Sequence, residues 1–396
     1  MKILIVSNRY WPENFRITDI AESLVKIGHD VTVLTGLPNY PEGYIHEEYK
    51  KGKNRKEYKN GVKIIRAKEI GRRQNVFFRV LSYYSFPYNA NKIVKELPDD
   101  FDIVLINGLS PIMSARPGLK YKKMHGTKVI MYGLDLWPAS LLAGGIWKNG
   151  LVYQYYKNVS RKIYCECDKI FASTYEHIDY IKNLKGCSNL DIEFLPQYCE
   201  ELFERKALKT IENDTIDILF AGNIGKAQSI DTIIKTANLL RNNKKYLFHI
   251  VGGGSELKKS KKKVEKFGLD NIIFYGQRSL EEMLEFYALA DVVLVTLEDK
   301  PYANMTVPGK VQSYMATGKP LLGAVNGATA ALITKSESGV VVNAEDYEAL
   351  AKAILELKKS DLEQYGKNAR KYYLEYFSKE YFMNKLNETL TKLGSK

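Results

Sequence analysis

Residues 307–322 read Val-Pro-Gly-Lys-Val-Gln-Ser-Tyr-Met-Ala-Thr-Gly-Lys-Pro-Leu-Leu. The apolar spacing predicts an amphipathic helix over 310–316. The Gly-Lys-Pro after it predicts a turn, because glycine commonly ends helices and proline cannot continue them. The apolar residues that follow predict a buried strand over 320–324. The start of this helix offers N–H groups and a positive dipole end to an anion, although an ordinary helix-to-strand connection has the same pattern.

Strand–helix units repeat on both sides of this stretch. In the first half, strands are predicted at 2–7, 31–35, 63–67, 103–106, 128–132 and 169–173, and helices at 18–27, 151–168 and 175–183. In the second half, strands are predicted at 216–220, 246–251, 272–275, 291–297, 320–324 and 340–342, and helices at 230–241, 255–267, 280–290 and 310–316. This alternation predicts an α/β fold of two doubly wound parallel sheets, with ligands beyond the carboxyl ends of the strands.

The length and composition limit the classes of protein to which the chain can belong. The chain has 396 residues and 45% hydrophobic content, which suits two domains with a core in each. The polar stretch 200–214 is the predicted linker between domains at 1–200 and 201–377, and one or two helices are expected over 372–393. No apolar run reaches the roughly 18 residues that span a bilayer, and no signal peptide precedes the first strand, so we expect a cytoplasmic protein. The four cysteines have neither metal-binding nor redox spacing, and we expect them to be reduced.

The net charge of +13 favours an anionic partner. Residues 50–73 carry eleven Lys and Arg against two Glu, and an aromatic stretch follows at 76–88. Basic residues beside apolar ones predict docking on an anionic membrane surface through Phe77, Phe78 and Tyr83. The alternative is a solvated loop before a buried helix. No known nucleic-acid-binding module is present, so no nucleic acid partner is expected.

Two strand–glycine junctions in the second half predict phosphate binding. Residues 220–226 read Phe-Ala-Gly-Asn-Ile-Gly-Lys, and residues 251–255 read Val-Gly-Gly-Gly-Ser. Small residues after a strand let backbone N–H groups approach phosphate oxygens closely. Lys310 lies in the first turn of its helix, where a cation opposes the helix dipole unless an anion neutralises it. A surface lysine and tight turns are the alternative interpretation.

Nearly the whole chain resembles the GT-B glycosyltransferases of family 4. The resemblance lies in 307–322, in Ser7-Asn8-Arg9-Tyr10-Trp11-Pro12-Glu13-Asn14 and in Gly28-His29-Asp30-Val31-Thr32-Val33-Leu34-Thr35. Residues 37–41 and 135–138 resemble a subgroup that makes bacterial surface polysaccharides, including N-acetyl-L-fucosamine transferase-like enzymes. The resemblance implies an acceptor-binding domain at 1–200, a nucleotide-sugar-binding domain at 201–377, a cleft between their facing sheets, and a terminal helix at 378–396 that crosses back to the first domain.

The resemblance also implies the donor site. The residues implied to bind the nucleotide sugar are Gly222, Asn223, Lys226, Gly252, Gly253, Arg278, Lys310 and Ser313. The family pattern has two glutamates eight positions apart in the last segment, where this chain has Met305 and Ser313. Ribose recognition is then expected to be weaker, or to shift to a neighbour such as Gln312. Asn223 stands where the family has an arginine.

On the acceptor side, Asp135 follows the apolar strand at 128–132. Its carboxylate is expected in the cleft, where it could orient the acceptor hydroxyl or take its proton. An N-cap for the helix entered at Pro138 is the alternative. Glu13 and Asn14 are expected on the acceptor side by resemblance.

The function implied is that of a retaining, metal-independent glycosyltransferase. Its donor would be a UDP-linked N-acetylated hexosamine or deoxyhexosamine, and its acceptor a polyprenyl-diphosphate-linked saccharide of capsule, O-antigen or exopolysaccharide biosynthesis at the inner face of the cell membrane. No metal or other cofactor is expected. A non-hydrolysing sugar-nucleotide epimerase and a basic nucleic-acid-binding protein are the alternatives. The epimerase would need further carboxylate–histidine pairs, and the chain has five His.

Overall fold

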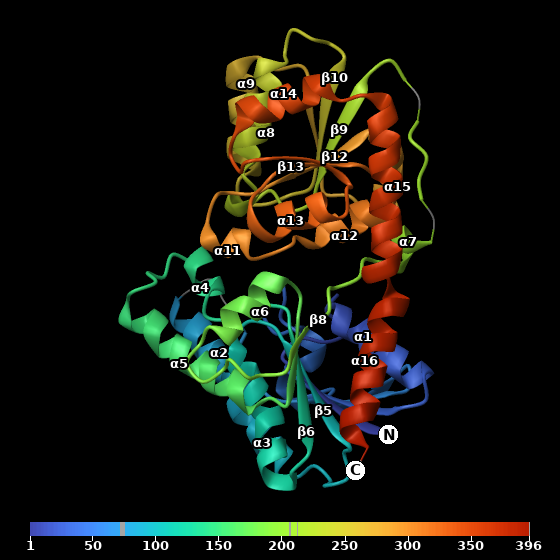
Figure 1. The fold of residues 1–396 in the computed structure, drawn as a ribbon. Helices are drawn as coiled ribbons and strands as arrows, with labels where there is room; N and C mark the ends of the chain where they lie inside the picture. Colours follow the sequence, from blue (N-terminus) through green and yellow to red (C-terminus); the bar gives the residue numbers. More distant parts are fainter. Residues whose placement is uncertain (72–75, 206, 212, 396) are drawn as a thin grey trace. The chain divides into compact units, whose positions relative to one another are not determined.

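The computed structural model describes residues 1–71, 76–205, 207–211 and 213–395. The chain forms two compact units, one of residues 1–195 and 383–396 and one of residues 196–382 (Figure 1). From the sequence, these boundaries were expected at 200 and 377. None of the helices in the described part of the chain is both long and apolar enough to cross a membrane.

The first unit is built on an eight-stranded sheet with strand order β3-β4-β2-β1-β5-β6-β7-β8. The strands are β1 (Lys2–Ser7), β2 (Asp30–Thr35), β3 (Lys56–Lys59), β4 (Val62–Arg66), β5 (Ile103–Gly108), β6 (Lys128–Gly133), β7 (Lys169–Ala172) and β8 (Ile192–Phe194). All pairs are parallel except β3 with β4. β5 is buried along its whole length, as expected for a strand covered on both faces.

Helices cover both faces of this sheet (Figure 1). They are α1 (Arg16–Lys26), α2 (Val76–Val94), α3 (Arg116–His125), α4 (Ser140–Ala143), α5 (Leu151–Glu166), α6 (Tyr175–Lys182) and α16 (Lys379–Gly394), with short 3-10 helices η1 (Glu47–Gly52) and η2 (Ile112–Ala115). α1 buries Ile17, Ile20 and Leu24 on one face at helical spacing.

The second unit holds a six-stranded, all-parallel sheet with strand order β11-β10-β9-β12-β13-β14. The strands are β9 (Ile216–Ala221), β10 (Tyr246–Val251), β11 (Ile272–Gly276), β12 (Val292–Thr296), β13 (Leu321–Ala324) and β14 (Gly339–Val342). The helices are α7 (Glu201–Glu204), η3 (Lys226–Gln228), α8 (Ile230–Leu239), α9 (Leu257–Phe267), α10 (Met283–Leu289), α11 (Pro301–Asn304), α12 (Gly309–Ala316), α13 (Gly327–Lys335), α14 (Tyr347–Glu356) and α15 (Lys359–Tyr376). The strand order reverses direction between β9 and β12, and ligands of doubly wound sheets bind beyond the carboxyl ends of the strands at such a point.

The predicted fold class of two doubly wound parallel sheets is confirmed. Every predicted strand is present within two residues of its expected ends. Two strands were not predicted: β3, which pairs antiparallel inside the basic segment 50–73, and β8, which closes the first sheet. Several helices were given no predicted range, among them α3, α13 and α14. α2 occupies the aromatic stretch 76–88 and continues to Val94, where the alternative interpretation expected a buried helix.

Candidate donor and acceptor sites

Three loops meet at the carboxyl edge of the second sheet. They follow β9, β10 and β11, and backbone hydrogen bonds hold them together. Gly222 N donates to Val251 O at 2.9 Å, Gly252 N to Gly276 O at 2.8 Å, and Ile224 N to Gly253 O at 2.8 Å. The two glycine junctions singled out in the sequence therefore form one surface.

Two positions on this surface, 252 and 254, require glycine. Gly252 has a φ of +140°, and a Cβ on it would lie 1.8 Å from Gly222 O. Gly254 has a φ of +153°, and its Cβ would lie 2.4 Å from Ile224 O. Any larger residue at either position would push the two loops apart, because the clash is with backbone. The close approach of bare backbone is the geometry that phosphate-binding loops use.

Lys310 lies over this surface from the first turn of α12. A Cβ on Gly222 would be 3.5 Å from Lys310 Cδ and 4.0 Å from its Nζ. The side chain as a whole is half-buried, but Nζ is buried and has no hydrogen-bond partner among the described residues. Nζ lies 3.4 Å from the centroid of the Phe220 ring, which gives it a cation–π contact.

Burial lowers the pKa of Lys310 well below its usual value, and no carboxylate offsets this effect. A buried ammonium group without a partner is costly, and an anion placed against it would remove that cost. The glycine loops, the start of α12 and Lys310 together fit a diphosphate. The sequence predicted diphosphate binding at Gly222, Gly252, Gly253 and Lys310, and this stays a prediction.

Ser313 has a carboxylate neighbour that the sequence analysis missed. Ser313 is buried on α12, and its Oγ donates to Glu200 Oε2 at 3.5 Å. Glu200, expected only as the first residue of the linker, thus brings a carboxylate to the position where the resemblance led us to expect one. Gln312 instead faces its own helix start, 2.8 Å from Gly309 O once its amide is oriented as a donor.

The other predicted donor ligands differ in how they are held. Asn223 Nδ2 donates to Gln228 Oε1 at 3.2 Å, so this side chain fixes its own loop. Lys226 is exposed at the first residue of η3. Arg278 forms an ion pair with Glu282 at 3.2 Å, one turn along the chain.

A second carboxylate at the carboxyl edge of this sheet was also missed. Glu298 follows β12, is buried, and accepts a hydrogen bond from Tyr302 Oη at 2.8 Å. Its backbone N–H donates to Ala227 O at 3.0 Å, which ties it to the loop after β9. The signal was present in the sequence, because Glu298 comes two residues after a buried strand, where site residues gather.

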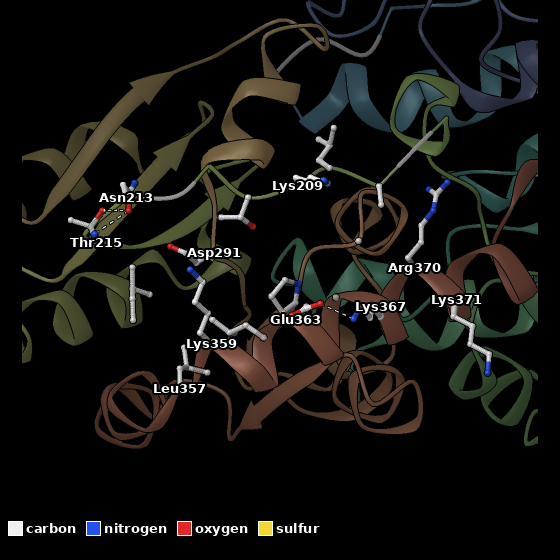
Figure 2. Close-up of a pocket in the computed structure, with 18 of the residues that line it drawn as sticks. Lys209, Asn213, Thr215, Asp291, Leu357, Lys359, Glu363, Lys367, Arg370 and Lys371 are labelled. Carbon is white, nitrogen blue, oxygen red and sulfur yellow. Dashed lines mark hydrogen bonds and ion pairs between the residues drawn. The ribbon is translucent and has the colours of Figure 1, made fainter.

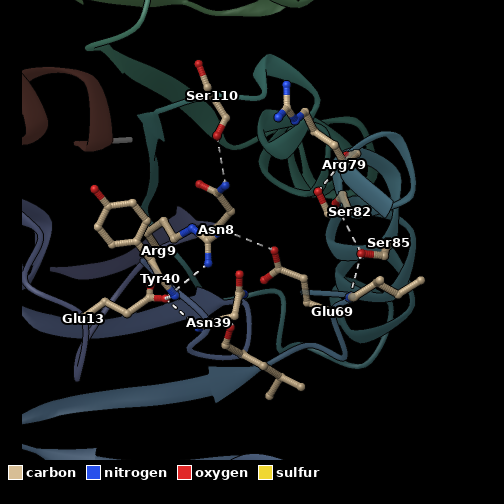
Figure 3. A network of polar contacts seen from close by, with 12 residues as sticks. Asn8, Arg9, Glu13, Asn39, Tyr40, Glu69, Arg79, Ser82, Ser85 and Ser110 are labelled. Carbon is tan, nitrogen blue, oxygen red and sulfur yellow. Dashed lines mark hydrogen bonds and ion pairs between the residues drawn. The ribbon is translucent and has the colours of Figure 1, made fainter. Parts of the chain in front are cut away.

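In the first unit, a buried polar network occupies the carboxyl edge of the sheet (Figure 3). Glu13 Oε1 accepts hydrogen bonds from the backbone N–H groups of Asn39 and Tyr40, both at 2.7 Å, and from Arg9 at 3.2 Å. Three bonds to one oxygen make Glu13 a support for the loop after β2. Asn14, the residue after it, is exposed.

Glu69 is a further member of this network that the sequence did not indicate. Its Oε1 lies 3.8 Å from the Arg9 guanidinium, and its Oε2 is buried with no hydrogen-bond partner among the described residues. A Cβ on Gly36 would lie 2.0 Å from that Oε2, so only glycine leaves room for it. Burial raises the pKa of Glu69 to about 7, although Arg9 opposes the effect.

Asp135 lies after β6, as expected. Its Oδ2 accepts a hydrogen bond from Ser110 N at 2.7 Å, and its own N–H donates to Gly108 O at 3.1 Å. It therefore links the loops after β5 and β6. It does not cap the next helix, because α4 begins after Ala139 with no side-chain cap. Asp135 is half-buried, so part of the carboxylate faces solvent.

The expected membrane residues on α2 need one correction. Tyr83 is buried and packs edge-on against Trp137, with 5.8 Å between ring centroids, so its ring is not available to a bilayer. Phe78 is half-buried. The side chain of Phe77 lies outside the described residues. Part of the aromatic stretch thus belongs to the core, as expected from the alternative interpretation of a buried helix.

A cavity lies at the opposite, amino edge of the second sheet (Figure 2). It has a volume of about 920 Å³, and basic side chains line it, including Lys209, Lys359, Arg370 and Lys371. Most of these side chains are exposed or already paired; Lys367, for example, binds Glu363 at 2.6 Å. Ligands of doubly wound sheets bind at the carboxyl edge, so we do not assign this cavity to the donor.

Among the described residues, no group of three or more His, Cys, Asp or Glu is placed to hold a metal ion. Metal independence stays a prediction.

Comparison with known proteins defines the class of this chain. Residues 203–372 match the family of glycosyl transferases group 1. The sucrose-phosphate synthase of Thermosynechococcus elongatus has the same fold, with a TM-score of 0.76 at 15% identity, covering 99% of this chain and 98% of that one. Anabaena HepE in complex with UDP and glucose has a TM-score of 0.70 at 14% identity, covering 99% and 100%.

The second unit of the chain therefore carries a domain of the glycosyl transferases group 1, and the chain is a glycosyltransferase with the GT-B fold. A curated relative is WcaI of Escherichia coli strain K12, named as a colanic acid biosynthesis glycosyl transferase. It is 26% identical over 345 residues, which cover 80% of this chain and 82% of WcaI.

Proposed function

We propose that this protein transfers a sugar from a UDP-sugar to a lipid-linked saccharide during synthesis of a bacterial surface polysaccharide. The sugar is an N-acetylated hexosamine or deoxyhexosamine, and the acceptor carries a polyprenyl diphosphate at the inner face of the cell membrane. The single observation that carries the donor half of this proposal is the buried Nζ of Lys310, which lies over the glycine loops without a partner.

UDP is the proposed donor nucleotide for two reasons. A diphosphate is the anion that fits a lysine, a helix start and two adjacent glycine loops. A protein of the same fold, HepE, was crystallised with UDP and glucose. In this arrangement the charge of Lys310 would stabilise the diphosphate as it leaves the sugar.

The acceptor half rests on the first unit. Asp135 presents a half-buried carboxylate at the carboxyl edge of the sheet, fixed through Ser110. Such a carboxylate would orient the acceptor hydroxyl, while the leaving diphosphate takes its proton and configuration at the anomeric carbon is retained. WcaI is named for colanic acid biosynthesis, which supports a surface polysaccharide as the product.

A thermal-shift screen of UDP-, GDP- and ADP-sugars tests the donor. A ligand that binds only the folded protein stabilises it by about 2.7 kcal/mol at a hundred times its Kd. We expect UDP-sugars to raise Tm and the others to have little effect. A shift with GDP- or ADP-sugars alone would overturn the choice of nucleotide.

A transfer assay with radiolabelled UDP-N-acetylhexosamines and a polyprenyl-diphosphate-linked sugar then tests the reaction. Label in the lipid fraction together with release of UDP supports the proposal. Conversion of the UDP-sugar to an epimer without transfer would identify the other enzyme class.

A further inference from the structure

An exposed apolar patch lies on the first unit, at the start of α5. The side chains of Trp147, Leu151, Val152 and Tyr155 are 71%, 90%, 53% and 53% exposed. The opposite face of the same helix is buried through Tyr153, Tyr156, Ser160 and Ile163. The outward face of a surface helix is normally polar. Here its first turns carry two aliphatic residues and a tyrosine, next to a tryptophan.

The neighbouring helix α2 also carries exposed apolar residues. Tyr84 Oη on α2 donates to Tyr156 Oη on α5 at 3.2 Å, so the two helices are neighbours. Trp137 joins them, because its ring packs against Tyr83 at 5.8 Å and against Tyr156 at 5.4 Å. α2 adds Val80 and Tyr88 as exposed apolar side chains.

The two stretches of sequence that carry the patch are basic. Residues 70–95 and 136–165 together contain nine Lys and Arg and no Asp or Glu, although the whole chain has 46 acidic residues in 396. Lys148 and Lys157 are exposed and lie close to the apolar residues in the sequence. The neighbouring helix α6, which contacts α5 through Tyr180 and Tyr153, carries the acidic residues Glu176 and Asp179. The excess of basic residues on α2 and α5 themselves favours an anionic partner.

We propose that Trp147, Leu151, Val152 and Tyr155 insert into the interface of an anionic bilayer, with the basic residues of α2 and α5 on its headgroups. Tryptophan and tyrosine favour the membrane–water interface, aliphatic side chains favour the acyl boundary, and basic residues bind anionic lipids. Exposed Leu and Val distinguish this surface from a nucleic-acid surface, which stacks bases on aromatic rings. Binding there would bring the protein to the membrane in which the proposed lipid-linked acceptor resides. Only this biological purpose rests on the proposed function; the membrane-binding surface itself does not.

Vesicle flotation tests the surface. The full chain is mixed with phosphatidylcholine vesicles, with or without phosphatidylglycerol, at low and high salt. We expect binding only to the anionic vesicles, weaker at high salt because the Debye length shrinks to a few ångströms. The variant L151S/V152S should bind at least tenfold more weakly at both salt concentrations, because it loses apolar burial. Failure of the wild type to float, or equal flotation of the variant, would overturn the proposal.

The matched control is L239S/L355S, which changes two leucines that are 52% and 54% exposed on the second unit. It should float like the wild type, and an equal loss would mean that any exposed leucine contributes.

Trp147 gives an independent signal, because Trp137 is buried and Trp11 half-buried. Anionic vesicles should shift the emission to the blue in the wild type and leave Trp147→Phe unshifted. Binding of RNA in place of vesicles would also overturn the proposal.

Calorimetry with UDP on the same samples separates this proposal from the proposed function. A variant that binds UDP normally but does not float supports the surface. A wild type that floats but binds no nucleotide leaves the surface standing and refutes the donor assignment.

Discussion

Replacing Lys310 by Met should have opposite effects on UDP binding and on the stability of the unliganded protein. Methionine keeps the length of the side chain and its contact with Phe220 but removes the charge. In the unliganded protein, Lys310 Nζ is buried without a hydrogen-bond partner among the described residues, so the wild type carries an unfavourable group at this position. In the UDP complex the same group would contact the diphosphate.

The size of both effects follows from these contacts. A hydrogen bond to a charged group contributes about 1.5–3 kcal/mol, so Lys310→Met should weaken UDP binding by roughly 10- to 150-fold. Removing a buried polar group that has no partner should stabilise the unliganded protein by about 1–3 kcal/mol. For a unit of this size, that corresponds to a rise in Tm of several degrees.

The pH dependence provides a sharper signature. The pKa of Lys310 is held well below its usual 10.5 in the folded protein, so unfolding takes up a proton at intermediate pH. Stability therefore rises with pH between the folded pKa and about 10.5, and Lys310→Met should remove this rise. UDP favours the ammonium form, so binding above the folded pKa should take up a proton.

Calorimetry in buffers of different ionisation enthalpy measures that proton uptake, and thermal melts measure the stability. Lys262→Met, which changes an exposed lysine on α9, is the control and should behave like the wild type. If Lys310→Met binds UDP with wild-type affinity, or lowers Tm, then the lysine is a structural group and our account of the donor site is wrong.

Three further outcomes follow from the two units. Asp135→Asn should lower turnover at least tenfold while UDP affinity and Tm stay within error, because Ser110 N can still donate to an amide oxygen; a large loss of Tm would instead indicate a purely structural role. Gly252→Ala should destabilise the second unit by about 2 kcal/mol or more and abolish UDP binding, since its Cβ would lie 1.8 Å from Gly222 O; a wild-type melting curve would contradict this geometry. The pKa of Glu69 is raised to about 7 in the folded protein, so between pH 4.5 and 7 the folded state holds a proton that the unfolded state has lost. The free energy of unfolding should therefore fall as pH rises from 4.5 to 7, and Glu69→Gln should flatten that fall in pH-dependent thermal melts. An unchanged slope would show that Glu69 does not titrate in this range.

Most of the fold could be predicted because buried parallel strands are continuous apolar runs. β5 and β12 are buried at every position, and such runs are visible without an alignment. β3 was missed because Lys56–Lys59 reads Lys-Glu-Tyr-Lys, a charged edge strand whose pairing depends on β4. α2 was expected only as the alternative interpretation, because it carries aromatic and aliphatic residues on all its faces and Pro87 interrupts the pattern.

The residues of the candidate site differ in the same way, because some carry a local sequence signal and others do not. The glycine junctions and Lys310 could be proposed from the sequence because they follow strands or begin a helix, which are local signals. The contacts of Glu200 with Ser313, and of Glu69 with Arg9, join residues more than fifty positions apart, so no local pattern predicts them. The patch at Trp147 was missed because composition and spacing do not show which apolar residues remain exposed after folding.

We expect UDP to bind where Lys310 lies over the glycine loops of the second unit. A crystal structure of the protein with UDP would show whether it does. We predict the diphosphate within hydrogen-bond distance of Lys310 Nζ and beside the backbone of Gly222 and Gly252. Density for UDP in the basic cavity at the opposite edge of the sheet, lined by Lys359 and Arg370, would contradict it.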